Sequence, residues 1–69
     1  MKLSARNILK GKVKQVIHGA VDSEITLELP GGMEVVSIIT KTSAQQLGLK
    51  EGMDAYAVIK SSEVIIAID

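Results

Sequence analysis

The sequence of 69 residues contains no cysteine, and it has only one proline, one histidine and one aromatic residue. Without cysteine the chain can form neither disulfide bonds nor thiolate zinc sites, and His18 alone cannot build a histidine-rich metal site. A domain this small buries only about 60% of the surface that its unfolded chain exposes, and such domains commonly depend on disulfides, metals or oligomerisation. Because 46% of the residues are hydrophobic, we expect a single domain over residues 1–69 that forms an obligate homo-oligomer.

An excess of charge of one sign is also absent, since eight basic residues balance eight acidic ones. Proteins that bind nucleic acids usually carry a basic excess, because neutralising phosphates supplies most of their non-specific affinity. Arg6, Lys10, Lys12 and Lys14 cluster near the N-terminus, but the alternation of the lysines is typical of a solvated strand face. No apolar run approaches the roughly 20 residues of a membrane helix, and residues 1–6 lack the apolar region of a signal peptide. We therefore expect a cytoplasmic protein.

Alternating apolar and polar residues predict a chain made mostly of β-strands. The alternation is cleanest from Val21 to Leu29, and Pro30-Gly31-Gly32 is a typical turn that ends this strand. Gly11 lies inside an earlier strand, where glycine indicates a bulge or the close approach of another backbone. On the return strand of the hairpin, we expect Glu34 to face a cationic partner across the strand pair. In chain order, the predicted strands cover residues 8–18, 21–29, 33–40, 53–60 and 63–68.

One short helix is predicted over residues 42–48, between the third and fourth strands. Ser43 can cap this helix, Gln46 three residues later can complete a capping box, and Gly48 is a natural stop. Five strands with one helix after the third suit a five-stranded OB-like barrel. We therefore expect an all-β fold of this kind, whose edge strands need partners or cover and thus favour an oligomer.

No constellation of residues indicates catalysis. His18, Asp22 and Ser23 lie beside one short turn, and they match neither the order of a known catalytic triad nor a nucleophile elbow. No glycine-rich loop precedes the helix, no carboxylates are paired on it, and no metal-ligand spacing is present. We therefore expect a binding protein without a cofactor, and not an enzyme.

Hydrogen-bond donors gather at three places where strands or the helix begin or end. Arginine offers a fork of N–H donors, lysine a point charge, serine and threonine rotatable hydroxyls, and a helix start adds free backbone N–H groups. A fully deprotonated tetrahedral dianion only accepts hydrogen bonds, so it would suit these carboxylate-free clusters if they meet in space. The serines also have a plainer interpretation, as helix caps or turn residues. The clusters are Ser4, Arg6 and Asn7; Thr40, Thr42 and Ser43; and Lys60, Ser61 and Ser62.

Three motifs that contain these donors resemble the molbindin (Mop) family, whose members bind molybdate. Residues 4–11, SARNILKG, resemble the opening motif of the family. Residues 37–52, SIITKTSAQQLGLKEG, are similar to its central motif, and residues 56–64, YAVIKSSEV, to its closing motif. The motifs occur in the family's order and span nearly the whole chain, so the resemblance is more specific than one short match.

The resemblance implies an OB-like fold with strands shared between subunits, assembled as a hexamer that is a trimer of dimers. It implies that molybdate or tungstate is bound at subunit interfaces, for intracellular storage or homeostasis of molybdenum. A further site on the threefold axis would lie near His18, Gly19 and Ala20. Carried over by position, the residues of the interface site are Ser4, Ala5 (through its backbone), Arg6, Thr40, Ser43, Lys60 and Ser61.

In such a site, Arg6 and Lys60 would counter the charge of the dianion, and hydroxyl and backbone N–H groups would orient it. Phosphate often carries a proton near neutrality and would find no acceptor, whereas the exclusion of sulfate would depend on cavity size. Two alternatives stay open. One is a small OB-fold nucleic-acid-binding module, although such modules stack bases on aromatic residues and this chain has only Tyr56. The other is a purely structural oligomerisation domain.

Overall fold

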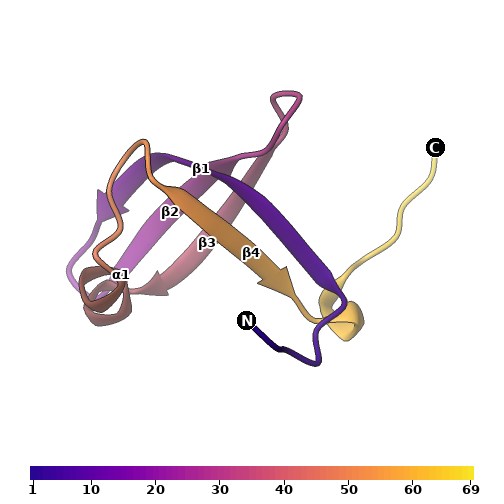
Figure 1. The fold of residues 1–69 in the computed structure, drawn as a ribbon, viewed down its shortest axis with the longest axis horizontal. Helices are drawn as coiled ribbons and strands as arrows, with labels where there is room; N and C mark the ends of the chain where they lie inside the picture. Colours follow the sequence, from indigo (N-terminus) through magenta and orange to yellow (C-terminus); the bar gives the residue numbers. More distant parts are fainter.

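The computed structural model describes all residues from 1 to 69. It contains six elements, in the order β1 (Asn7–His18), β2 (Asp22–Glu28), β3 (Glu34–Thr40), α1 (Lys41–Leu47), β4 (Asp54–Ile59) and the 3-10 turn η1 (Ser61–Glu63). The strands form one antiparallel sheet in the order β3-β2-β1-β4. The sheet curls into an open half-barrel, with α1 at one end and η1 at the other (Figure 1).

The longest strand, β1, joins the two halves of the sheet. Residues 7–12 pair with β4, and residues 12–18 pair with β2 across a bulge between Val13 and Gln15. A bulge of this kind bends the strand and increases its twist. At Gly11, just before the bulge, a Cβ atom would lie 2.6 Å from the carbonyl oxygen of Glu28. The close approach of another backbone that the sequence predicts at Gly11 is therefore confirmed.

The core is small and lies on the concave face of the sheet. Its four buried hydrophobic residues are Val13, Ile25, Leu27 and Ala44, and Ala44 comes from α1, which closes one end of the half-barrel. Only seven of the 69 residues are buried. Because burial of apolar surface is the main favourable contribution to folding, most of the stabilising surface of this hydrophobic chain is still accessible in a single copy.

The convex face carries charged side chains that bridge neighbouring strands. Glu28 on β2 lies opposite Glu34 on β3, and Lys14 contacts both: it forms an ion pair with Glu34, and its Nζ atom is 3.7 Å from Glu28 Oε2. The hydrogen bond and the charge of Glu34 raise the pKa of Lys14 above its usual value. The expectation that Glu34 faces a cation across the strand pair is wrong, because the residue directly opposite Glu34 is Glu28; the cation that pairs with Glu34 is Lys14, which comes from β1.

The helix begins earlier than the sequence suggested. Thr40 is its N-cap, with extended backbone angles, and its hydroxyl accepts a hydrogen bond from the backbone N–H of Ser43. Ser43 therefore lies at the third helical position, and the predicted capping box of Ser43 and Gln46 is wrong. The physical reason is that an N-cap needs extended backbone angles, and Thr40 already has them as the last residue of β3. Gly48 ends the helix in the left-handed region, at φ 63°, as predicted.

No helix in the structure is long and apolar enough to cross a membrane. The longest, α1, has seven residues.

The fifth predicted strand, over residues 63–68, is absent from the single chain. Ser61–Glu63 form the turn η1 instead, and residues 64–69 extend away from the sheet (Figure 1). The side chains of Ile65, Ile66 and Ile68 are 91%, 83% and 93% exposed. A strand exists only where it can pair its backbone with another strand, and this tail (residues 64–69) has no such partner within its own chain. The mostly-β fold with one short helix is thus confirmed, but a single copy is a four-stranded half-barrel and not the predicted five-stranded OB-like barrel.

Candidate functional site

The opening and closing motifs meet at one end of the sheet. Asn7 is paired with Ile59 across β1 and β4, and its side-chain Nδ2 donates a hydrogen bond to the carbonyl oxygen of Ile59, at 3.3 Å. Arg6 and Lys60 are the next residues beyond this pair, so the fold brings the two predicted cations to the same edge. We call this end, with Ser4, Ala5, Arg6, Lys60 and Ser61, the basic half-site.

Arg6 and Lys60 are exposed and form no ion pair. This distinguishes them from the lysines of β1, all three of which are paired with carboxylates. Asn7 was named among the donors but not among the predicted site residues. The structure shows that Asn7 ties the two motifs together, and its place beside Arg6 in the opening motif was the available signal.

Thr40 and Ser43 lie together at the junction of β3 and α1. The hydroxyl of Thr40 donates a hydrogen bond to Ser43 Oγ at 2.8 Å, and it accepts the backbone N–H of Ser43 at 3.0 Å. The hydroxyl proton of Thr40 is thus occupied, whereas the hydroxyl proton of Ser43 is free to donate to a ligand. We call this pair the hydroxyl half-site.

The two half-sites lie at opposite ends of the same sheet. The basic half-site adjoins Asn7 at the start of β1, whereas Thr40 is paired with Asp22 at the start of β2, next to the end of β1 at His18. A strand of twelve residues spans roughly 35–40 Å at about 3.3 Å per residue, and the long axis of the molecule measures 35 Å. One copy of the chain therefore cannot bring Arg6 and Ser43 to the same ligand.

One carboxylate close to the hydroxyl half-site was not foreseen. Asp22 lies directly opposite Thr40 in the β2–β3 pairing, and both residues are exposed. The three donor clusters are free of acidic residues along the chain, but strand pairing brings in an acidic neighbour from another segment. The sequence of the clusters does not reveal that strand register places Asp22 opposite Thr40.

The predicted axial segment, His18, Gly19 and Ala20, forms the tight connection between β1 and β2. The Nδ1 atom of His18 lies 2.6 Å from Ser23 Oγ, and the backbone N–H of Gly19 donates to the carbonyl oxygen of Asp22. Ser23 is only 1% exposed. A substrate in solution therefore cannot reach Ser23 as a nucleophile with His18 as its base. The segment is exposed and lies at the same end of the sheet as the hydroxyl half-site.

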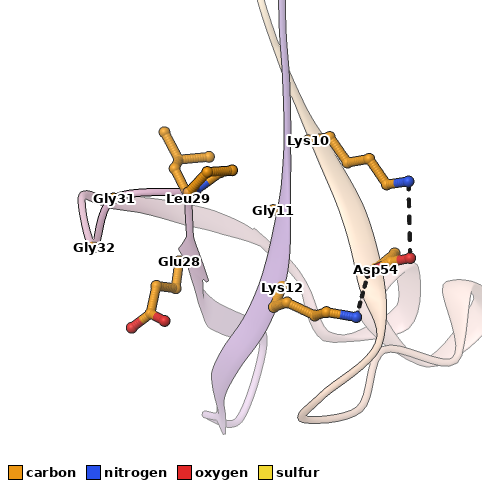
Figure 2. Close-up of a pocket in the computed structure, with 9 residues that line it drawn as sticks. Lys10, Gly11, Lys12, Glu28, Leu29, Gly31, Gly32 and Asp54 are labelled. Carbon is orange, nitrogen blue, oxygen red and sulfur yellow. Dashed lines mark ion pairs between the residues drawn. The ribbon is translucent and has the colours of Figure 1, made fainter.

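Two of the lysines near the N-terminus, Lys10 and Lys12, line a shallow hollow of about 360 Å³ beside the β2–β3 hairpin (Figure 2). Lys12 Nζ is 2.7 Å from Asp54 Oδ1, and Lys10 Nζ is 3.9 Å from Asp54 Oδ2. The hydrogen bond from Lys12, followed by the charges of Lys12 and Lys10, holds the pKa of Asp54 below its usual value. Asp54 thus offsets much of the positive charge of this surface.

The largest hollow is an apolar groove of about 640 Å³ on the concave side, between the edge strands β3 and β4. Fourteen of its 16 lining residues are hydrophobic, and they include Ile25, Leu27, Ile39 and Ala57. No charged cluster of the kind that holds a metal ion is present anywhere in the chain.

Residues 3–66 match the family model of the TOBE domain. The chain is 53% identical to molybdenum-pterin-binding protein 3 of Clostridium pasteurianum over 66 residues, which cover 96% of this chain and 97% of the relative. It also matches the structure of MopII from Clostridium pasteurianum, with a TM-score of 0.92 and 46% identity, over 97% of this chain and 100% of the other.

Two further structures are similar. A molybdate-binding protein from Sporomusa ovata has a TM-score of 0.92 and 34% identity, over 99% of this chain and all of the other. The cytoplasmic molybdate-binding protein ModG, with molybdate bound, has a TM-score of 0.91 and 55% identity, over 94% of this chain and 46% of ModG. Three of these four relatives are described by what they bind, in agreement with the expectation of a binding protein rather than an enzyme. The chain therefore belongs to the TOBE domain family and, within it, to the molybdenum-pterin-binding (Mop) proteins.

Proposed function

We propose that this protein binds molybdate in the cytoplasm, as the free oxyanion, and stores or buffers it at sites built between subunits. The observation that carries the proposal is the division of the donor set into two half-sites at opposite ends of one chain. The relatives support the choice of ligand, since they are described as molybdenum-pterin-binding or molybdate-binding, and ModG is described as cytoplasmic.

The chemistry of the donors suits a tetrahedral dianion. Arg6 and Lys60 have no carboxylate partner in the chain, so both charges are available to the ligand. The hydroxyls of Ser4, Ser61 and Ser43 and the backbone at Ala5 add donors, and charge-assisted hydrogen bonds of this type are roughly twice as strong as neutral ones. Tungstate has the same charge and shape, and we propose that it binds in the same way.

Assembly would complete both the site and the fold. The groove between β3 and β4 lies where a fifth strand would close the barrel, and the tail that should supply that strand points away from its own chain (Figure 1). The tail carries Val64, Ile66 and Ile68 at alternate positions, as a strand that faces an apolar core does. We propose that the tail of a second copy occupies the groove, that the exchange is reciprocal, and that three such dimers form a hexamer.

The alternative of a nucleic-acid-binding OB module is less well supported. Such a module needs free positive charge and aromatic residues on which bases can stack. Lys10 and Lys12 are instead paired with Asp54, and Tyr56 is the only aromatic residue.

The proposal is tested by titrating the purified protein with molybdate in a calorimeter. We expect Arg6→Ala and Lys60→Ala each to weaken binding at least tenfold, since removing a charged hydrogen-bond donor costs about 1.5–3 kcal/mol. The matched control is Lys50→Ala, which removes an exposed lysine that lies outside both half-sites. Wild-type affinity in both site variants would refute the proposed site, and absence of molybdate binding by the wild type would refute the function.

A further inference from the structure

Asp22 places a carboxylate beside the hydroxyl half-site. Asp22 and Thr40 are directly opposed in the β2–β3 pairing, and the Cβ atoms of such a pair lie about 4.5–5.5 Å apart on the same face of the sheet. Their neighbours Ser23 and Ile39, which are also paired with each other, are buried and half-buried, so Asp22 and Thr40 both face outward. The side chain of Asp22 therefore lies within reach of a ligand that is held by Ser43.

The carboxylate of Asp22 has no partner in its own chain. It forms no ion pair, not even with Lys41 next to Thr40, and no group donates a hydrogen bond to it. Glu24, the next outward residue of β2, adds a second negative charge. On the side of β1 the neighbour is Gly19, whose backbone N–H donates to the carbonyl oxygen of Asp22 at 2.7 Å and which has no side chain to cover the carboxylate. Both carboxylate oxygens are therefore available to accept a hydrogen bond from a ligand.

The hydroxyl half-site and Asp22 together present one donor and one acceptor. The hydroxyl proton of Thr40 is used by Ser43 Oγ, at 2.8 Å, so the donor is the hydroxyl of Ser43. A fully deprotonated dianion such as molybdate or sulfate uses this donor but is repelled by the carboxylate. A tetrahedral oxyanion that keeps one proton uses both groups, because its own hydroxyl donates a charge-assisted hydrogen bond to Asp22.

We propose that Asp22 determines the specificity of the oxyanion site and admits tetrahedral oxyanions that carry one proton, of which hydrogen phosphate is the simplest. The proposal rests on the proposed function, since it assigns Asp22 to the same site. The three donor clusters contain no acceptor, and on that ground the sequence favours the exclusion of phosphate. Strand pairing supplies the missing acceptor from β2, so phosphate competes with molybdate in this protein.

A comparison of phosphate with sulfate isolates the hydrogen bond to Asp22. The two anions are similar in size, and at mildly alkaline pH both are mainly dianions, but only phosphate carries a proton. Repulsion by Asp22 acts on both anions alike, so it cancels in the ratio of their affinities. The ratio therefore reports the hydrogen bond, and a change in charge alone does not alter it.

The test titrates phosphate and sulfate separately as competitors of molybdate in a calorimeter, at mildly alkaline pH. We expect the wild type to bind phosphate more tightly than sulfate, and Asp22→Ala to lower the phosphate-to-sulfate affinity ratio about tenfold, as the loss of a hydrogen bond to a charged group does. The matched control is Glu24→Ala, which removes a carboxylate from the same face of β2, one outward position further from the hydroxyls, and should leave the ratio unchanged. If Asp22→Ala fails to fold by circular dichroism, Asp22→Asn keeps the size of the side chain and should lower the ratio in the same direction.

The outcomes separate this inference from the proposed function. An Asp22→Ala ratio equal to that of the wild type overturns the assignment, and so does a wild type from which phosphate displaces molybdate no better than sulfate does. Direct titration with phosphate alone covers the remaining case. A wild type that binds phosphate but not molybdate, with a preference over sulfate that Asp22→Ala abolishes, supports the role of Asp22 and refutes the proposed function.

Discussion

The hydroxyl of Thr40 makes two hydrogen bonds to Ser43 at the start of α1, since it accepts the backbone N–H of Ser43 and donates to the side-chain oxygen of Ser43. The pair therefore serves the helix in the absence of any ligand. Thr40→Ala removes the cap and should lower the free energy of unfolding by about 1 kcal/mol, and it should also weaken molybdate binding. Thr40→Ser keeps the hydroxyl and should retain both properties, as measured by denaturant unfolding and calorimetry. Equal stability of the alanine variant and the wild type would contradict this account.

Gly11 should tolerate no side chain. A Cβ atom there would meet the backbone oxygen of Glu28 at 2.6 Å, and backbone cannot move aside as a flexible side chain can. Gly11→Ala should therefore destabilise the protein by roughly 1–3 kcal/mol through overpacking, seen as a lower midpoint of thermal unfolding. Lys10→Ala, at the neighbouring exposed position, serves as the control and should have a smaller effect. A Gly11→Ala protein that unfolds at the wild-type temperature would show that the two strands lie further apart.

Asp54 should make stability depend on pH in a defined direction. Its pKa is lowered in the folded state by the hydrogen bond from Lys12 and by the nearby charges, so its contribution to stability is present above the unfolded pKa, near 3.8. That contribution is lost as the pH falls through the lower folded pKa. Asp54→Asn should thus lower the midpoint of thermal unfolding at pH 7, and the difference from the wild type should vanish well below pH 3.8.

Because Asp54 and its lysines are exposed, the same difference at pH 7 should shrink in high salt. Glu51→Gln, which removes an exposed carboxylate without an ion pair, provides the control. A difference that persists in acid would mean that Asp54 acts through packing rather than charge.

Asp22 should weaken anion binding at the hydroxyl half-site. Its carboxylate lies opposite Thr40, and like charges a few ångströms apart at an exposed position repel by about 1 kcal/mol. Asp22→Asn should therefore raise the affinity for molybdate by about fivefold at low salt, with a smaller gain at high salt. Glu24→Gln, one outward-facing position further along β2, should give a smaller gain. Equal affinities of Asp22→Asn and the wild type would show that the ligand binds away from Thr40.

The parts of the fold that depend on one chain were predictable from the sequence. Alternation identified the first two strands, and the hairpin turn identified the third. Gly11 and Gly48 indicated a close backbone approach and a helix end that the structure contains. The prediction of a strand in the tail was wrong because residues 64–68 have the composition of a strand but find no strand of their own chain with which to pair. The N-cap was predicted at Ser43 instead of Thr40 because Thr40 was assigned only to a strand. One residue can both end a strand and cap the helix that follows.

The candidate site was predictable as a set of residues but not as an arrangement. The motifs supplied the donors, and the pairing of Asn7 with Ile59 brings two of the three clusters together. The distance between Arg6 and Ser43 and the presence of Asp22 beside Thr40 follow from strand register, which the sequence does not state.

A mixing experiment tests most directly whether each site takes its half-sites from two chains. One parent carries Arg6→Ala and Lys60→Ala, and the other carries Ser43→Asp, which places a carboxylate in the hydroxyl half-site where helix starts tolerate it. Neither parent should bind molybdate alone. After the two chains are unfolded and refolded together, random pairing should restore about a quarter of the wild-type sites, since every mixed dimer contains one intact site. Titration that finds this fraction supports the account, and a mixture that binds no more molybdate than its parents contradicts it.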